Sequence, residues 1–158
     1  MLLCWRNETR KKLNALKRAH MGIDAREMPR PGEPVICLKN DHEMGIMNGA
    51  VYPLVRFDHG EGWCSVTVNN EYGRPVEVDA WVEDLHEAGK DEMSGGKSRF
   101  DEPIGFALGY CATVHKYQGS EADFPILVDE YNRREERLEW LNTGISRAAK
   151  RILVQRDW

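Results

Sequence analysis

The sequence lacks several features that would assign it to a class of protein at once. Its 158 residues include four single cysteines and no Cys-x-x-Cys pair, so neither a zinc site nor a disulfide framework is indicated. No apolar run approaches the roughly 18 residues that a membrane helix needs, and no signal-peptide pattern opens the chain. We therefore expect a reduced, cytoplasmic protein of one ordinary domain, or of one domain with a small insert.

A phosphate-binding loop is also missing. The run Gly95-Gly96-Lys97-Ser98 resembles the end of the G-x-x-x-x-G-K-[ST] motif, but Asp91 stands where its first glycine belongs. No apolar strand leads into this run, and the sequence has no second Gly-Lys-Ser/Thr. The sequence therefore predicts no P-loop in this chain.

Positive charge is scarce in the middle of the chain. The formal net charge is −4, yet residues 1–20 carry six Lys and Arg against one Glu, and residues 133–158 carry seven against four Asp and Glu. Residues 21–132 carry nine against 21. Basic ends form a local anion-binding surface if the fold brings them together. Solvated helix faces explain the same pattern equally well.

Two kinds of pattern alternate along the chain. Apolar runs separated by helical segments predict parallel strands covered by helices on both faces. The strands are expected at residues 2–5, 34–38, 104–108, 124–128 and 152–155, with helices at 7–20 and 135–150. Short β-like runs and turns between them predict a small barrel-like insert, followed by a mobile loop at 87–99. The expected fold class is α/β, with the sheet at 1–48 and 100–158 and the β-rich insert at 49–99.

A polar segment, Ala112–Glu121, follows an apolar strand pattern. Hydroxyl, imidazole, ammonium and amide donors lie within six of its residues, where a βα loop presents them together: Thr113, His115, Lys116 and Gln118. Gly119 allows a close backbone approach to a ligand, and Glu121 can accept hydrogen bonds from hydroxyls such as those of a ribose. By composition alone, a polar helix start with a cap and a turn glycine is the favoured interpretation.

A second segment, Trp140–Lys150, carries hydroxyls and an arginine near the end of a predicted helix. Arg147 stands between Ser146 and Ala148, two small residues that let its guanidinium lie against another surface. A guanidinium offers a planar fork for phosphate oxygens and stays charged at physiological pH. A surface arginine favoured by the helix dipole is the common alternative.

In this order, the segments resemble superfamily 1 DNA helicases of the RecD/Dda type, specifically their second RecA-like motor domain. Ala112–Glu121 resembles motif V, "TvHKsQGsE", and Leu141–Lys150 resembles motif VI, "lYtaiTRAkk". Leu3–Asn14 is similar to motif IV, and Val35–Gly49 to the segment that precedes the family's SH3-like insert. The resemblance implies a RecA-like parallel sheet, as in the second motor domain of P-loop NTPases of this kind, with a small SH3-like insert.

The resemblance also implies roles for individual residues. Arg147 matches the arginine finger that meets the γ-phosphate of ATP, and is the expected catalytic residue. The expected nucleotide-binding residues are Gly119, Glu121, Arg6 and Gln118. The expected contacts to single-stranded DNA are Thr113, His115, Lys116 and Asn40. Tyr117 departs from the family pattern, which has a small residue there; an aromatic ring stacks on a base or, more commonly, packs in the interior.

The function implied is that of the C-terminal motor domain of an ATP-dependent DNA helicase. Its expected partners are single-stranded DNA and a first motor domain, in cis or in trans, that carries the P-loop and the Mg²⁺ ligands. ATP and Mg²⁺ are then bound jointly, and this chain alone is not expected to hydrolyse ATP. The alternatives are an accessory module that binds single-stranded DNA and a helicase remnant without ATPase activity.

Overall fold

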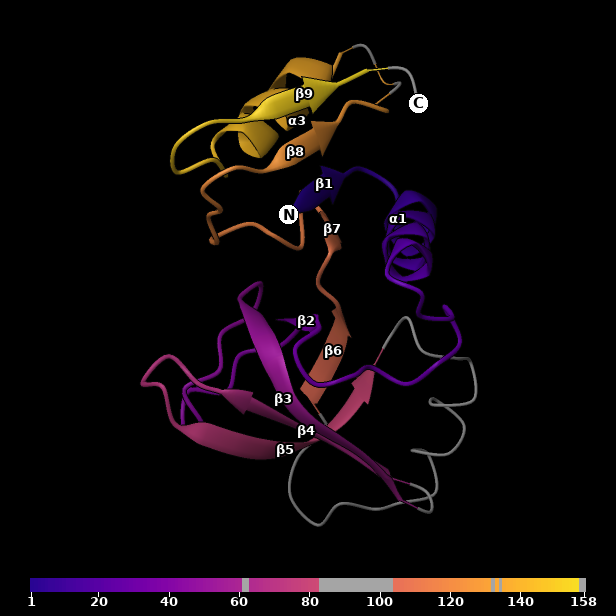
Figure 1. Ribbon diagram of the computed structural model, residues 1–158. Helices are drawn as coiled ribbons and strands as arrows, with labels where there is room; N and C mark the ends of the chain where they lie inside the picture. The colour runs from indigo at the N-terminus through magenta and orange to yellow at the C-terminus, as the bar shows by residue number, and fades with distance from the viewer. Residues whose placement is uncertain (61–62, 83–103, 132, 134, 157–158) are drawn as a thin grey trace. The chain divides into compact units, whose positions relative to one another are not determined.

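A computed structural model of the chain describes residues 1–60, 63–82, 104–131, 133 and 135–156 (Figure 1). The chain divides into two units. The first, here called the sheet unit, comprises Met1–Met21 and Tyr110–Trp158, and the second, the barrel unit, comprises Gly22–Gly109. The loop expected at 87–99 and its Gly95–Ser98 run lie outside the described residues.

The sheet unit contains four parallel strands in the order β7-β1-β8-β9. Their bounds are Leu2–Cys4 for β1, Cys111–Thr113 for β7, Ile126–Val128 for β8 and Leu153–Gln155 for β9. The interior strand β1 is apolar throughout, because a parallel strand covered on both faces has no solvent-facing side. Leu3 and Cys4 are accordingly 0% exposed. The expected parallel sheet is confirmed.

Helix α1 (Asn7–His20) packs against β1 and β7. Its basic character is only partly displayed at the surface, because Arg10 and Arg18 are buried, whereas Lys11 and Lys17 are exposed. Some basic residues of the N-terminal segment are therefore buried in the fold, and only the others are accessible to solvent or to an anion. Neither described helix is long and apolar enough to cross a membrane.

Helix α3 (Arg137–Ile145) is shorter than the helix expected at 135–150. The chain leaves the helix at Ser146, and Ala148 then forms a parallel bridge with Ala122. The backbone groups that would continue the helix are thus used in pairing with the segment before β8. The helix boundary predicted from the pattern was wrong by several residues for this reason.

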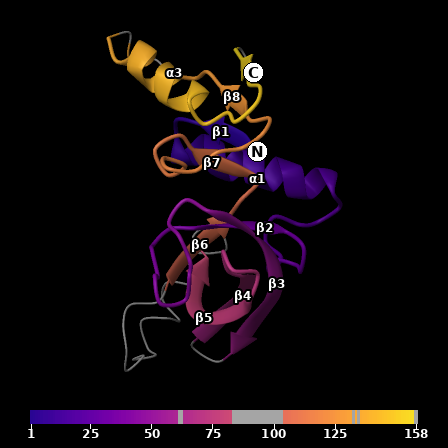
Figure 2. The same cartoon turned by 90° about the vertical axis from the view of Figure 1, so that its left-hand side faces the viewer.

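The barrel unit is a closed barrel in the order β2-β3-β4-β5-β6 (Figure 2). The strand bounds are Pro34–Cys37 for β2, Val51–Gly60 for β3, Trp63–Asn69 for β4, Pro75–Val82 for β5 and Ile104–Leu108 for β6. We expected β2 and β6 in the parallel sheet. They instead pair antiparallel with each other, Val35 opposite Leu108, and close the barrel. Along the chain, the boundaries between the two units therefore fall at residues 21–22 and 109–110, whereas we expected them at 48–49 and 99–100.

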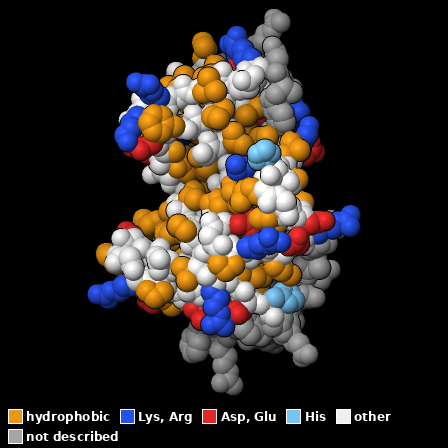
Figure 3. All heavy atoms as spheres, viewed as in Figure 1, with side chains coloured by type: hydrophobic (Ala, Val, Ile, Leu, Met, Phe, Trp, Pro, Cys, Tyr) orange, Lys and Arg blue, Asp and Glu red, His pale blue; other side chains and the backbone are white. Residues whose placement is uncertain are grey.

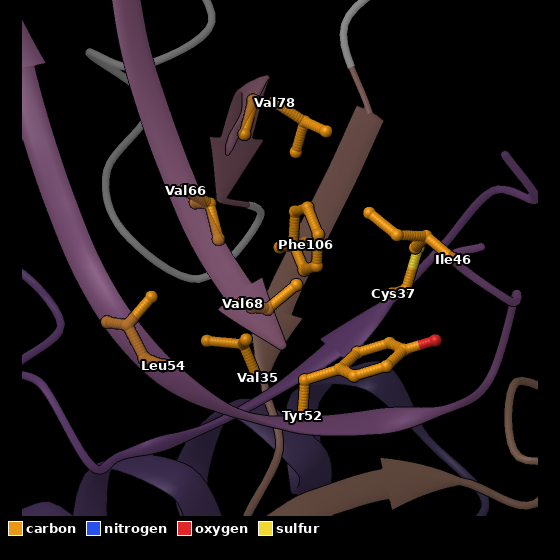
Figure 4. Close-up of a cluster of buried hydrophobic side chains, with 10 residues drawn as sticks. Val35, Cys37, Ile46, Tyr52, Leu54, Val66, Val68, Val78 and Phe106 are labelled. Carbon is orange, nitrogen blue, oxygen red and sulfur yellow. The ribbon is translucent and has the colours of Figure 1, made fainter. Parts of the chain in front are cut away.

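Alternate residues of the barrel strands fill its core (Figure 4). In β3, Tyr52 and Leu54 point inward while Pro53 and Val55 are exposed, as the period of two in a strand requires. Phe106 of β6 is 0% exposed, and burial of such a side chain contributes roughly 1.5–3 kcal/mol. The other buried members are Val35, Cys37, Ile46, Val66, Val68, Val78 and Ala80.

Candidate functional site

The loops that follow β1, β7 and β8 lie at one edge of the sheet unit, because the carboxyl ends of parallel strands meet there. Arg6 follows β1, His115 follows β7 and Glu130 follows β8. Arg6 and His115 are exposed, and Glu130 is half-buried. Two of the residues expected from the motifs are thus presented to solvent at this edge.

The turn after β7 is held by its own backbone. The Tyr117 amide donates to the Thr113 carbonyl at 3.0 Å, and the Lys116 amide donates to the Thr113 hydroxyl at 3.3 Å. Thr113 is 6% exposed, so its side chain caps the turn and is turned away from solvent. His115 and Gln118 are exposed, and Lys116 is half-buried. The turn therefore presents the imidazole of His115 and the amide of Gln118 at the surface, while Thr113 holds the shape of the turn.

Gly119 ends this turn with a positive φ of 92°. Residues with a side chain rarely adopt this backbone conformation, but glycine adopts it readily. A Cβ atom at this position would meet nothing within 4 Å, so the backbone here borders open space. Tyr117 beside it is 4% exposed, and its hydroxyl donates to the Glu121 carbonyl at 2.8 Å. Burial raises the pKa of Tyr117. Of the two roles considered for this aromatic ring, packing in the interior is the one observed.

Arg147 connects the two motif segments. Its amide carbonyl accepts from the Ala122 amide at 2.9 Å, and its Nη1 lies 3.5 Å from the Ser120 carbonyl oxygen. Its Nε donates to the Thr143 carbonyl at 3.2 Å, and its Nη2 donates to the Ser146 hydroxyl at 2.9 Å. The guanidinium is half-buried and is held beside the turn that contains Gly119. The expected catalytic residue and that glycine turn are therefore neighbours.

Glu130 fixes the start of α1. One of its carboxylate oxygens accepts from the backbone amides of Trp5 and Arg6, both at 2.9 Å, and the other accepts from the Thr9 hydroxyl at 2.5 Å. A carboxylate at a helix start accepts hydrogen bonds from backbone amides, and its negative charge interacts favourably with the positive end of the helix dipole. Sequence reasoning assigned no role to Glu130; its position directly after a strand was the available signal.

An aromatic group adjoins this carboxylate. The ring of Trp5 lies 4.3 Å from that of Tyr131, which lies 5.3 Å from that of Trp140. The guanidinium carbon of Arg6 lies 5.0 Å from the centroid of the Trp5 ring, a cation–π distance. The backbone of Arg6 is thus set by Glu130 and its side chain by Trp5, which orients the charge that follows β1.

Asp129 holds the end of β8 to two arginines. Its side chain is 2% exposed, and it accepts from Arg137 in α3 and, at 3.0 Å, from Nε of Arg156. Burial alone would raise the pKa of Asp129, but hydrogen bonds from Arg137 and Arg156 lower it below its ordinary value. This ion-pair group ties α3 and the end of β9 to the central sheet.

Asn40 belongs to the barrel unit, whereas the other expected site residues belong to the sheet unit. Its side-chain oxygen accepts from the Asn48 amide at 2.7 Å, which closes the loop between β2 and β3. Asn40 thus lies in a different unit of the chain from Thr113, His115 and Lys116.

Two arginines of the sheet unit carry donors of the kind that phosphate oxygens accept. Arg147 and Arg6 present guanidinium donors, which match phosphate geometry. Among the residues that the structure describes, no group of three or more His, Cys, Asp and Glu side chains is placed to hold a metal.

Comparison with known proteins identifies the region that contains both motif segments. Residues 108–154 match the UvrD-like helicase C-terminal domain. The chain is similar in structure to the Pif1 helicase from Bacteroides in complex with ADP-AlF3 and ssDNA, with a TM-score of 0.60 and 17% identity over 98% of this chain and 40% of that chain. For the Pif1 helicase from Candida albicans the TM-score is 0.55, with 14% identity over 97% of this chain and 44% of that one. No curated protein matches the chain in sequence.

The chain spans about two fifths of the length of these solved helicases. At this level of identity the likeness establishes the fold, and the match to the family model is confined to residues 108–154. The resemblance to superfamily 1 helicases is confirmed: residues 108–154 match the UvrD-like helicase C-terminal domain, and the chain shares the fold of the corresponding part of Pif1 helicases.

Proposed function

We propose that the chain is the C-terminal motor part of an ATP-dependent DNA helicase, and that Arg147 is its arginine finger. The observation that carries the proposal is the junction of Arg147 with the turn at Ser120, which joins motif VI to motif V. A guanidinium at such a junction responds to the nucleotide and to the loop that follows β7 at once. The Bacteroides Pif1 structure holds ADP-AlF3 and ssDNA, which is the pair of ligands that this proposal requires.

The contacts of Arg147 leave it suited to an anion. Its side-chain acceptors among the described residues are two backbone carbonyls and the Ser146 hydroxyl, all of them neutral. A phosphate oxygen is a charged acceptor, and hydrogen bonds between charged partners are roughly twice as strong as neutral ones. An ATP γ-phosphate therefore competes well for Arg147, whose charge stabilises the transferring phosphoryl group.

The proposal divides the nucleotide site between two domains. Gly119, Gln118, Glu121 and Arg6 border the nucleotide on this chain, while a first motor domain, in cis or in trans, supplies the P-loop and the Mg²⁺ ligands. Bound Mg²⁺ neutralises charge on the phosphates. This chain alone then does not hydrolyse ATP. We place the protein in the cytoplasm, where its four free cysteines stay reduced. We assign the barrel unit as the SH3-like insert.

The charge distribution supports a single-stranded DNA contact on the sheet unit. Residues 1–21 and 110–158 contain 14 Lys and Arg against nine Asp and Glu, although the whole chain is acidic. His115 and Lys116 face the same edge as Arg6. Contacts of this kind follow the phosphate backbone and weaken as the salt concentration rises.

The test is ATP turnover by the chain combined with a P-loop motor domain, in the presence of single-stranded DNA. Arg147→Ala is expected to lower kcat by about 10³-fold and to leave DNA affinity within severalfold. Arg151→Ala removes an exposed arginine four residues away and serves as the matched control. Unchanged turnover in Arg147→Ala would overturn the assignment.

The positive sheet unit also fits a second candidate, an accessory module that binds single-stranded DNA without an ATPase. The discriminating measurement is a titration of the chain with labelled single-stranded DNA at low and moderate salt, with and without ATP. Salt-sensitive binding together with no ATP turnover after a P-loop motor domain is added favours the accessory module. Restored turnover favours the motor.

A further inference from the structure

The barrel unit presents three large apolar side chains to solvent on two adjoining segments. Met44 and Met47 lie in the loop between β2 and β3, and Tyr72 lies at the turn between β4 and β5. They are 41%, 37% and 70% exposed. We call these three residues the Met–Tyr patch. Figure 3 shows how hydrophobic side chains lie among charged ones on one face of the molecule.

The patch is held rigidly. The Asn70 amide nitrogen donates to the Met44 carbonyl at 2.9 Å, and the Glu71 backbone amide donates to the Gly45 carbonyl at 3.3 Å. The side-chain oxygen of Asn70 also accepts from the amides of Tyr72 and Arg74, each at 3.0 Å. The turn and the loop are thus hydrogen-bonded to each other, so the backbone that carries the exposed side chains does not need to be ordered when a ligand binds.

Gly45 seats the tyrosine ring. A Cβ at Gly45 would lie 3.0 Å from Cε2 and 3.2 Å from Cδ2 of Tyr72, so the ring lies against the backbone of this glycine. Gly45 has a φ of 67° and is itself buried. One part of the ring is fixed in this way and the remainder stays open to solvent, as in a preformed contact surface.

The loop that carries the methionines is closed by its own hydrogen bonds. Asp41 and Ile46 exchange both backbone hydrogen bonds, at 2.7 and 2.8 Å, and the Asp41 carboxylate accepts from the Met44 amide at 2.9 Å. The Met47 amide donates to the buried Tyr52 hydroxyl at 2.9 Å. Ile46 fills the barrel core while its neighbours Met44 and Met47 project outward. The outward direction of the methionines is therefore imposed by the barrel.

The surroundings of the patch are acidic. Glu43 and Glu71 are exposed beside Met44 and Tyr72, and Asp41 is half-exposed; His42 and Arg74 are basic side chains exposed in the same loop and turn. The barrel unit as a whole contains 17 Asp and Glu against eight Lys and Arg, counted over residues 22–109. A phosphate backbone is repelled by such a surface, and a cationic partner is attracted.

We propose that the Met–Tyr patch is a docking surface for a protein segment that combines apolar side chains with Lys or Arg. The methionines adapt to apolar side chains of varied shape, Tyr72 provides a rigid aromatic contact, and Glu43 and Glu71 pair with the cations. This surface lies in the barrel unit, whereas the ATP and DNA contacts proposed above lie in the sheet unit. The barrel unit then serves to recruit a partner protein.

The experiment measures binding of a labelled 16-residue amphipathic peptide of Leu and Lys to the chain, by fluorescence anisotropy at moderate salt. Tyr72→Ala and the double variant Met44→Ala/Met47→Ala are expected to weaken binding at least tenfold. The double variant Glu43→Lys/Glu71→Lys is expected to weaken peptide binding more than either of these variants does, because it replaces attraction of the lysines by repulsion. A peptide with Glu in place of Lys is expected not to bind.

Matched controls separate the patch from general charge and general hydrophobicity. Asp79→Lys changes an exposed acid of β5, and Val55→Ala trims an exposed apolar side chain of β3, which is 41% exposed; neither is expected to alter binding more than twofold. Equal loss in the controls, or no binding of the Lys peptide, overturns the proposal. So does a labelled single-stranded oligonucleotide that binds the chain and loses its affinity in Tyr72→Ala. Thermal unfolding of each variant confirms that its fold is kept.

Discussion

Asn14 of α1 holds both backbone groups of Cys111 in the edge strand β7. Its side-chain oxygen accepts from the Cys111 amide at 2.9 Å, and its nitrogen donates to the Cys111 carbonyl at 3.2 Å. Both residues are buried, at 1% and 0% exposure. The side chain thus takes the place of a further strand at an edge whose backbone groups would otherwise be unpaired, and it ties the helix of motif IV to the strand that leads into motif V.

Asn14→Ala is therefore expected to destabilise the sheet unit by about 2–4 kcal/mol, since two buried backbone groups each lose a partner. Lys11→Ala, which removes an exposed side chain from the same helix, is expected to change stability by less than about 0.5 kcal/mol. Urea unfolding followed by circular dichroism measures both. Equal stability of the two variants would show that water replaces the asparagine without cost.

Glu130→Ala is expected to cost about 1–2 kcal/mol, because the Trp5 and Arg6 amides and the Thr9 hydroxyl lose their acceptor. Glu130→Gln keeps an acceptor oxygen for the two amides and should retain more than half of the stability. Glu135→Ala, at an exposed position of the same region, is the control. A Gln variant as unstable as the Ala variant would mean that the charge, rather than the hydrogen bonds, is what matters.

The stability of the chain is expected to depend on Asp129 in acid. Because the folded-state pKa of Asp129 is lowered by Arg137 and Arg156, its contribution is fully present above the ordinary pKa of about 3.9. The contribution is lost as the pH falls from there through the lowered folded-state pKa. Thermal unfolding between pH 7 and pH 2 should show a shallower acid loss in Asp129→Asn than in the unchanged chain. Parallel curves would contradict this.

Gly144 allows α3 to lie close to β8. A Cβ at Gly144 would lie 2.9 Å from Cδ2 and 3.0 Å from Cδ1 of Leu127, which is fully buried. Gly144→Val is therefore expected to destabilise the chain by about 1–3 kcal/mol through overpacking. Truncation of the facing residue should reduce this cost, so the two changes are expected to be non-additive in the double variant Gly144→Val/Leu127→Ala. Additive costs in the double-mutant cycle would place the strain elsewhere.

Most of the individual strands were predictable, but their partners were not. Apolar runs at residues 34–38 and 104–108 are equally compatible with a parallel sheet and with a barrel, because a strand's pattern records which faces are buried and not which strand lies beside it. The pairing of Val35 with Leu108 spans 73 residues. It moved both strands from the expected sheet into the barrel.

By itself, the sequence determined what depends on local pattern: the presence of helix α1 and the two motif segments that lie within the family match at 108–154. The tertiary structure decided what depends on contacts between distant residues. It set Glu130 on the amides of Trp5 and Arg6, buried Arg10 and Arg18, and placed Arg147 beside Ser120. These relationships form only when distant segments of the chain come together. A hydrogen bond or a buried charge between such segments does not change the periodic residue pattern of either segment, so the sequence pattern does not predict it.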